Sequence, residues 1–180
     1  MAYVEDNGGY LPAYATKFSG GGSRALWYTE LRPYIRTDAE IKVDRSDPRY
    51  AQHGINLPEF YCPSVSYEEA YPHTHYGYNY AVAGWQFWLD ENLDQYNRRR
   101  FLSISEPAAT ILFMEHLVPG SARWPKGGWQ TVPRRLEDPA YFPKERHDGL
   151  VNAAFCDGHA ESIPWQNIHG NLEGYFPSLR

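Results

Sequence analysis

The sequence predicts an α+β fold, in which a few helices pack against an antiparallel sheet and are joined by long ordered loops. Four short apolar or alternating segments have the length of strands, near 76–83, 109–115, 150–156 and 159–163. Aromatic residues make up 16% of the 180 residues, beside 15 glycines and 14 prolines, which is typical of loops held by large flat side chains. We expect one domain over residues 1–180, with its own core.

Charge and hydropathy exclude several classes of protein. The net charge of −5 argues against a nucleic-acid-binding protein, which is normally basic. No apolar stretch is long enough for a membrane-spanning helix. The first residues lack the basic start and apolar region of a signal peptide.

Two helices are expected in the first part of the chain. Residues 1–9 have the pattern of a helix end, because Ala2–Val4 is followed by Asp-Asn-Gly-Gly. A helix this short is marginal alone, so we interpret it as the stub of a longer helix. A second helix is predicted near 24–32, capped by Ser23 and stopped or kinked by Pro33.

The first two strands lie in the middle of the chain. Tyrosine recurs at a spacing of two in 76–83, which predicts one packed face. The apolar run in 109–115 predicts a buried strand. Residues 119–146 are too long for a structureless loop in a compact domain. The tail after Pro164 is predicted to be a loop anchored by Tyr175 and Phe176.

The last two strands are expected to form a hairpin around a two-residue turn at Asp157-Gly158. This turn predicts that Cys156 pairs with His159, Phe155 with Ala160 and Ala153 with Ser162. The strand period of two then places one apolar and one polar set on opposite faces. The apolar set is Val151, Ala153, Phe155 and Ala160, and the polar set is Asn152, Cys156, His159 and Glu161.

The same hairpin carries a motif. Nine residues separate His147 from Asp157-Gly158, and this spacing resembles the C-terminal His, nine residues, Asp-Gly signature of prepilin-like proteins. Four further blocks resemble that family in the same order: residues 3–12, the Cys-Pro segment 60–64, the block 75–79 with histidine where the family has serine, and the strand 107–115. The signature residues are His147, Asn152, Phe155, Asp157, Gly158 and His159, with Tyr76, Gly77 and Asn79 from the earlier block.

The resemblance implies a type IV pilin-like or type II secretion pseudopilin-like fold, with an antiparallel sheet packed on a long N-terminal helix. It further implies a non-catalytic structural subunit of an extracytoplasmic bacterial filament, periplasmic or at the cell surface. Its partners would be copies of itself or other pilin-like subunits. Membrane contact would come only through the apolar helix that this sequence lacks.

The signature also raises the question of a metal. His147, Asp157 and His159 are a conceivable ligand set for zinc or another transition metal. The favoured interpretation is structural: Asp157 and Gly158 form the turn, Asp157 accepts backbone N–H groups, and His147 supports it. Because pseudopilins bind calcium in a C-terminal loop, the resemblance also allows calcium at Asp148 and Asp157.

The two cysteines, Cys62 and Cys156, are far apart in sequence and form no Cys-x-x-Cys pair, which excludes a zinc knuckle. They are either a disulfide, as expected of an exported protein, or two buried free thiols. The chain lacks the nucleophile elbow, the phosphate loop and the His-Glu-x-x-His motif, so we expect no enzyme.

The alternative function is a secreted glycan- or ligand-binding module on the same fold. Its candidate contacts are four tryptophans in or beside loops, where exposed rings stack on sugars: Trp85, Trp88, Trp124 and Trp129. Packing in a loop-rich core is the favoured role for these rings.

Overall fold

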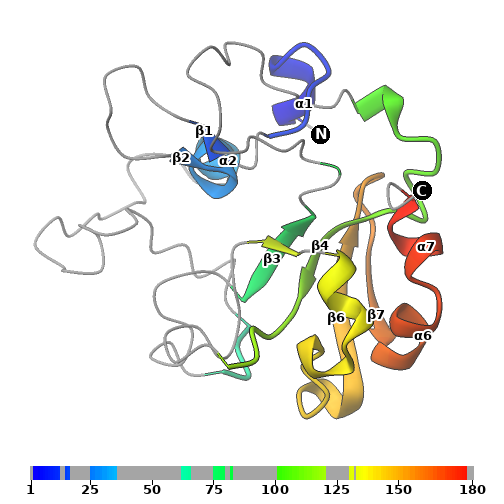
Figure 1. Ribbon diagram of the computed structural model, residues 1–180. Helices are drawn as coiled ribbons and strands as arrows, with labels where there is room; N and C mark the ends of the chain where they lie inside the picture. Colours follow the sequence, from blue (N-terminus) through cyan, green and yellow to red (C-terminus); the bar gives the residue numbers. More distant parts are fainter. Residues whose placement is uncertain are drawn as a thin grey trace, which may run out of the picture.

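The computed structural model describes residues 2–12, 15–16, 25–35, 62–65, 75–79, 82, 101–120, 130–131 and 133–177. In this part of the chain a five-stranded sheet has the order β5-β3-β4-β6-β7 (Figure 1). Its strands are β3 (Tyr76–Asn79), β4 (Ile111–Glu115), β5 (Gln130–Thr131), β6 (Leu150–Phe155) and β7 (Ala160–Pro164). Neighbouring strands are antiparallel, except that β5 runs parallel to β3. The predicted α+β class with an antiparallel sheet is confirmed.

Short helices surround this sheet. They are α1 (Ala2–Asp6), α2 (Trp27–Ile35), α6 (Trp165–Gly170) and α7 (Leu172–Tyr175). The described residues also form the 3₁₀ helices η2 (Phe101–Ser103), η3 (Pro133–Glu137), η4 (Pro139–Tyr141) and η5 (His147–Gly149). A two-stranded ribbon pairs β1 (Ala15–Thr16) with β2 (Ala25–Leu26). Over the described residues, no helix has the length and apolar character needed to cross a bilayer.

The main core lies on one face of the sheet. In β6 buried and half-buried positions alternate, so Val151, Ala153 and Phe155 all point to this face. Ile168 and Phe176, both fully buried, bring α6 and the end of α7 onto the same cluster. Figure 1 shows these two helices beside β7.

The opposite face carries aromatic residues. Tyr78 and Phe113 are paired across β3 and β4, and their rings stack at 4.9 Å. The fully buried Trp27 of α2 packs on both, at 5.6 Å from Tyr78 and 4.8 Å from Phe113. Because Phe113 alternates with the core residue Met114, α2 covers the side of the sheet opposite the main core.

The two N-terminal helices follow the sequence closely. Gly8 and Gly9 end α1 with φ angles of +63° and +86°, and the Gly9 N–H donates to the Val4 carbonyl at 2.8 Å. The second helix begins at Trp27 rather than near residue 24, because the two preceding residues pair as β2. It continues through Pro33 to Ile35. Ser23 lies outside the described residues.

The predicted hairpin register is wrong by one residue. Ala154 pairs with Ala160, Ala153 with Glu161 and Asn152 with Ser162, so Glu161 joins the core face and Ala160 the other. The loop has three residues instead of two, since Phe155 N–H donates to the His159 carbonyl at 2.9 Å. Cys156 leaves the ladder because its N–H is bonded to the Thr110 carbonyl.

The tail is also more regular than expected. Residues after Pro164 form α6 and α7 instead of a loop, although Phe176 is an anchor, as predicted. The strand expected over 76–83 is described as a strand to Asn79, and the residues after it lie largely outside the described part. Regular structure in 119–146 is confirmed by β5, η3 and η4.

Candidate functional site

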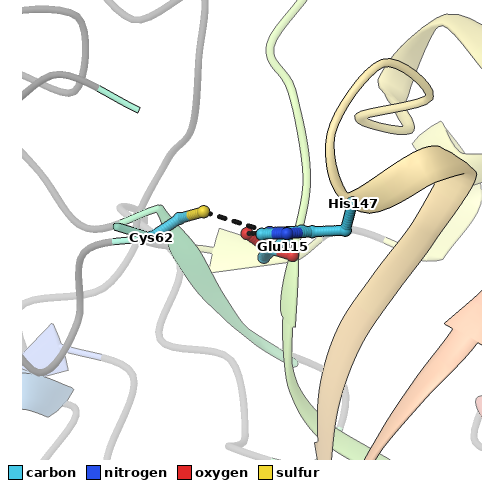
Figure 2. A group of neighbouring side chains, drawn as sticks. All are labelled: Cys62, Glu115 and His147. Atoms are coloured by element: carbon cyan, nitrogen blue, oxygen red, sulfur yellow. Dashed lines mark hydrogen bonds and ion pairs between the residues drawn. The ribbon is translucent and has the colours of Figure 1, made fainter. Parts of the chain in front are cut away.

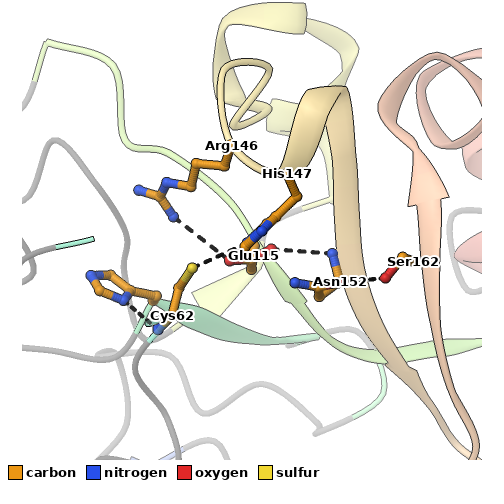
Figure 3. A network of polar contacts seen from close by, with 7 residues as sticks. Cys62, Glu115, Arg146, His147, Asn152 and Ser162 are labelled. Atoms are coloured by element: carbon orange, nitrogen blue, oxygen red, sulfur yellow. Dashed lines mark hydrogen bonds and ion pairs between the residues drawn. The ribbon is translucent and has the colours of Figure 1, made fainter. Parts of the chain in front are cut away.

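A polar network is centred on Glu115, the last residue of β4, whose side chain is fully buried. Its Oε1 lies 3.2 Å from His147 Nε2 and 4.0 Å from an Arg146 guanidinium nitrogen. Its Oε2 accepts the Asn152 N–H at 3.1 Å. The carboxylate therefore joins β4, η5 and β6 (Figure 3).

Strand alternation explains the position of Glu115. It pairs with Tyr76 across β3 and β4 on the face opposite the main core. Burial, and then the Glu115 carboxylate, raise the pKa of Tyr76 to about 12, so its phenol remains protonated. On the same face, Ser162 donates to Asn152 Oδ1 at 2.6 Å and fixes the edge of the network on β7.

His147 reaches Glu115 because of an unusual backbone. His147 and Asp148 have φ angles of +47° and +55°, and Gly149 follows at +83°. Residues with side chains rarely adopt this left-handed region, and such positions persist where other contacts hold them. The turn directs the imidazole back over the sheet, as Figure 2 shows.

Cys62 approaches from a segment far away in the sequence. Its Sγ lies 3.1 Å from His147 Nε2, and its N–H donates to His75 Nδ1 at 2.6 Å. The Val65 N–H donates to the Cys62 carbonyl and closes a turn at this point. Desolvation, and then the hydrogen bond to Glu115, raise the pKa of the Cys62 thiol. A buried thiol with a raised pKa lacks the marks of an activated nucleophile.

The geometry also differs from that of a nucleophilic triad. In a triad the acid orients one imidazole nitrogen while the other nitrogen faces the nucleophile. Here Glu115 and Cys62 approach the same atom, His147 Nε2. These three residues form the group of potential metal ligands found among the described residues, with ligand atoms all within 4.8 Å of one another.

The structure does not bring the predicted metal ligands together. His147 precedes β6, whereas Asp157 and His159 follow it, and a six-residue strand separates the two ends by about 20 Å. The same distance separates Asp148 from Asp157, so the two carboxylates cannot share a calcium ion. His147 also gives no support to the Asp-Gly turn.

The structural role of Asp157 is confirmed. Its Oδ1 accepts the His159 N–H at 3.1 Å and lies 2.6 Å from His159 Nδ1. These hydrogen bonds lower the pKa of Asp157. Gly158 adopts φ +98° in the turn, which favours glycine.

The remaining signature residues pack the sheet. Asn79 donates to the Ile111 carbonyl at 2.7 Å, Gly77 accepts a hydrogen bond from Thr131 Oγ1 at 3.0 Å, and Phe155 lies in the main core. Cys62 and Cys156 are both free and buried, which corrects the disulfide alternative. Cys156 clusters with Leu11 and Val82, and burial raises its pKa to about 12.

Sequence reasoning missed the centre of this site. Glu115 is the last residue of the segment predicted as a buried strand, and Arg146 directly precedes the signature residue His147. The available signal for this network is a carboxylate at the end of an apolar strand. A buried carboxylate needs hydrogen-bond or ion-pair partners, so its position indicates a buried polar network. The four tryptophans considered for glycan contact, Trp85, Trp88, Trp124 and Trp129, lie outside the described residues.

The chain was also compared with known proteins. No family model, no curated protein and no solved structure matches it. The site is therefore defined by its geometry alone: a buried thiol, a buried carboxylate and a partly exposed imidazole that join three distant segments of the chain.

Proposed function

We propose that this chain is the globular domain of a pilin-like or pseudopilin-like subunit, a non-catalytic component of an extracytoplasmic bacterial filament. The observation that carries the proposal is the packing of α1 on the sheet. Val4 of α1 and Leu112 of β4 pack against one cluster, which contains Leu11. The helix α1 thereby packs against an antiparallel sheet, which is the arrangement that the family resemblance implies.

Exposed apolar side chains near α1 support a role in assembly. The Tyr34 ring meets Tyr3 of α1 at 5.3 Å, and Asn7 donates to its hydroxyl at 3.4 Å. Phe101 N–H donates to the Gly9 carbonyl at 2.8 Å, which places the neighbouring Leu102 beside the end of α1. Leu102 is 88% exposed. Tyr34 and Leu102 are thus two exposed side chains next to α1, and in the proposed function they contribute to a contact between subunits.

The polar network supports a structural rather than a catalytic role. Its cysteine and carboxylate are fully buried, and its hydrogen bonds join segments of the fold. In the proposed function this network holds the Cys62–Val65 turn on the sheet. The partners of the chain are then copies of itself or other pilin-like subunits.

Negative-stain microscopy of the natively expressed protein tests the proposal. We expect filaments, and we expect the coding sequence to specify an apolar helix directly before Ala2 that continues α1. Discrete particles alone, or a polar segment before Ala2, would contradict self-assembly.

A further inference from the structure

We propose that Cys62, Glu115 and His147 form a binding site for one zinc-class divalent transition metal ion. The proposal is independent of filament assembly. Ligand atoms in a tetrahedral site with bonds of about 2.0–2.3 Å lie about 3.3–3.6 Å apart. The observed separations are 3.1 Å from Cys62 Sγ to His147 Nε2 and 3.2 Å from that nitrogen to Glu115 Oε1. The third separation, between Cys62 Sγ and a Glu115 carboxylate oxygen, is within 4.8 Å. Small side-chain movements therefore bring all three ligand atoms to tetrahedral distances.

The donor types select the class of metal. A thiolate, an imidazole and a carboxylate suit zinc and similar transition metals. Calcium and magnesium prefer sites built entirely from oxygen ligands. The two anionic ligands together balance the charge of one divalent ion, and the thiol proton is released to solvent when the ion binds.

Convergence on one atom favours a metal over a chain of hydrogen bonds. His147 Nε2 faces both the Cys62 sulfur and Glu115 Oε1. A single N–H at this nitrogen points to one of them, whereas an ion between the three atoms contacts all of them. In a metal-free arrangement, Cys62 and His147 can both donate a hydrogen bond to the Glu115 carboxylate. The experiment below distinguishes that arrangement from a metal site.

Neighbouring groups hold the ligands in place. Glu115 Oε2 is fixed by the Asn152 N–H at 3.1 Å, which leaves Oε1 for the ion. The Cys62 backbone N–H donates to His75 Nδ1 at 2.6 Å, and the Val65 N–H donates to the Cys62 carbonyl at 3.2 Å, which fixes the backbone that carries the thiol. Outer hydrogen bonds of this kind orient ligands in metal sites. His147 is 21% exposed, while the other two ligands are buried, so solvent reaches the site past the imidazole.

The site would join segments that are distant in sequence. Cys62 and His147 are 85 positions apart, and His147 and Glu115 are 32 apart. Within the described part of the chain, the group consists of these three ligands. An ion that binds only the folded chain stabilises it by mass action.

Cobalt substitution tests the proposal directly. The whole chain is treated with chelator, kept reduced and titrated with Co²⁺. We expect a thiolate-to-cobalt charge-transfer band and the visible bands of tetrahedral Co²⁺, saturating at one ion per chain and abolished by Zn²⁺ but not by Ca²⁺. Zn²⁺ should also raise the Tm, and chelator should lower it again.

Matched variants identify the ligands. Cys62→Ser and His147→Gln should weaken Zn²⁺ binding by at least about 100-fold, beyond the 10–100-fold typical of an outer-shell change. The controls Cys156→Ser and His159→Gln replace the other cysteine and an exposed histidine, and should leave the cobalt spectrum unchanged. Wild-type protein that gives no charge-transfer band would overturn the proposal without any variant. Unaltered Zn²⁺ affinity in folded Cys62→Ser would overturn it as well.

Discussion

Gly77 is the position at which the packing between strands leaves no room for a side chain. A Cβ there would lie 2.5 Å from His116 Cε1 and 2.6 Å from Thr131 Oγ1. Both neighbours are buried, so neither can move away at low cost. Gly77→Ala should therefore lower the free energy of unfolding by about 1–3 kcal/mol, the usual cost of overpacking. Urea unfolding followed by tryptophan fluorescence measures the change.

Gly170→Ala provides the matched control for Gly77→Ala. Apart from its chain neighbours and the backbone of its own helix α6, no heavy atom lies within 4 Å of the position that a Cβ would take. Alanine should be neutral or stabilising by about 0.5–1 kcal/mol. Equal stabilities of the two variants would show that the contact at Gly77 is not a packing constraint.

Asp157 makes the hairpin turn sensitive to acid. Its pKa is lowered by the His159 backbone N–H and imidazole, so the folded chain favours the ionised carboxylate. Its stabilisation is therefore present above the ordinary aspartate pKa of about 3.9 and is lost as the pH falls through the lowered value. Asp157→Ala should unfold at lower urea concentration than wild type at pH 6, and the difference should disappear near pH 2.

The exposed Glu161 on the same hairpin is the control for this acid effect. Glu161→Ala should not reproduce the pH-dependent difference. An unchanged gap between wild type and Asp157→Ala at pH 2 would show that the carboxylate charge is not the cause.

At the scale of elements, α6 is held to the sheet by one deeply buried side chain. Ile168 is 0% exposed and belongs to the main core. Ile168→Ala should lower the free energy of unfolding by about 2–5 kcal/mol, because it removes buried methyl groups and leaves a cavity. Hydrogen exchange should show the largest loss of protection in α6 and β7, which contact each other.

Gln166→Ala is the control on the same helix. Gln166 is exposed, so its truncation should change stability by no more than about 0.5 kcal/mol. A comparable loss in both variants would mean that helix propensity, and not core packing, holds α6 in place.

The elements that sequence could predict are those with a local signal. An apolar run located β4, the segments on either side of the Asp-Gly turn located β6 and β7, and the Asp-Asn-Gly-Gly stop located the end of α1. The hairpin register was missed because a tertiary hydrogen bond, from Cys156 N–H to the Thr110 carbonyl, decides it. Such a bond joins residues far apart in sequence and leaves no local pattern.

The candidate site was predicted in parts but not as a whole. His147 and Cys62 were both singled out, each with the wrong partners. The sequence spacing suggested that His147 lies near Asp157. In the structure, the extended strand β6 separates these two residues. The left-handed backbone at η5 directs the His147 imidazole toward β4. Only the strand order brings Glu115 between them.

At the scale of the whole molecule, the two faces of the sheet have different roles. One face is covered by α6 and α7 and supplies the main core. The other face carries the polar network and the aromatic residues Trp27, Tyr78 and Phe113. Val4 of α1 packs in the cluster that contains Leu11 and Leu112. The most exposed apolar side chain among the large ones described, Leu102, lies beside α1 rather than on the main-core side.

Leu102→Asp therefore tests whether this place mediates assembly. Burying a leucine contributes about 1.5–3 kcal/mol, and each 1.4 kcal/mol is tenfold in an equilibrium constant, so the critical concentration for filaments should rise about 10- to 100-fold. The Tm of the subunit should be unchanged, because Leu102 is 88% exposed. Gln166→Asp makes the same charge change on α6 and should leave assembly intact. If both variants assemble like wild type in a sedimentation assay, the surface beside α1 is not a subunit contact, and the apolar exposure of Leu102 requires another partner.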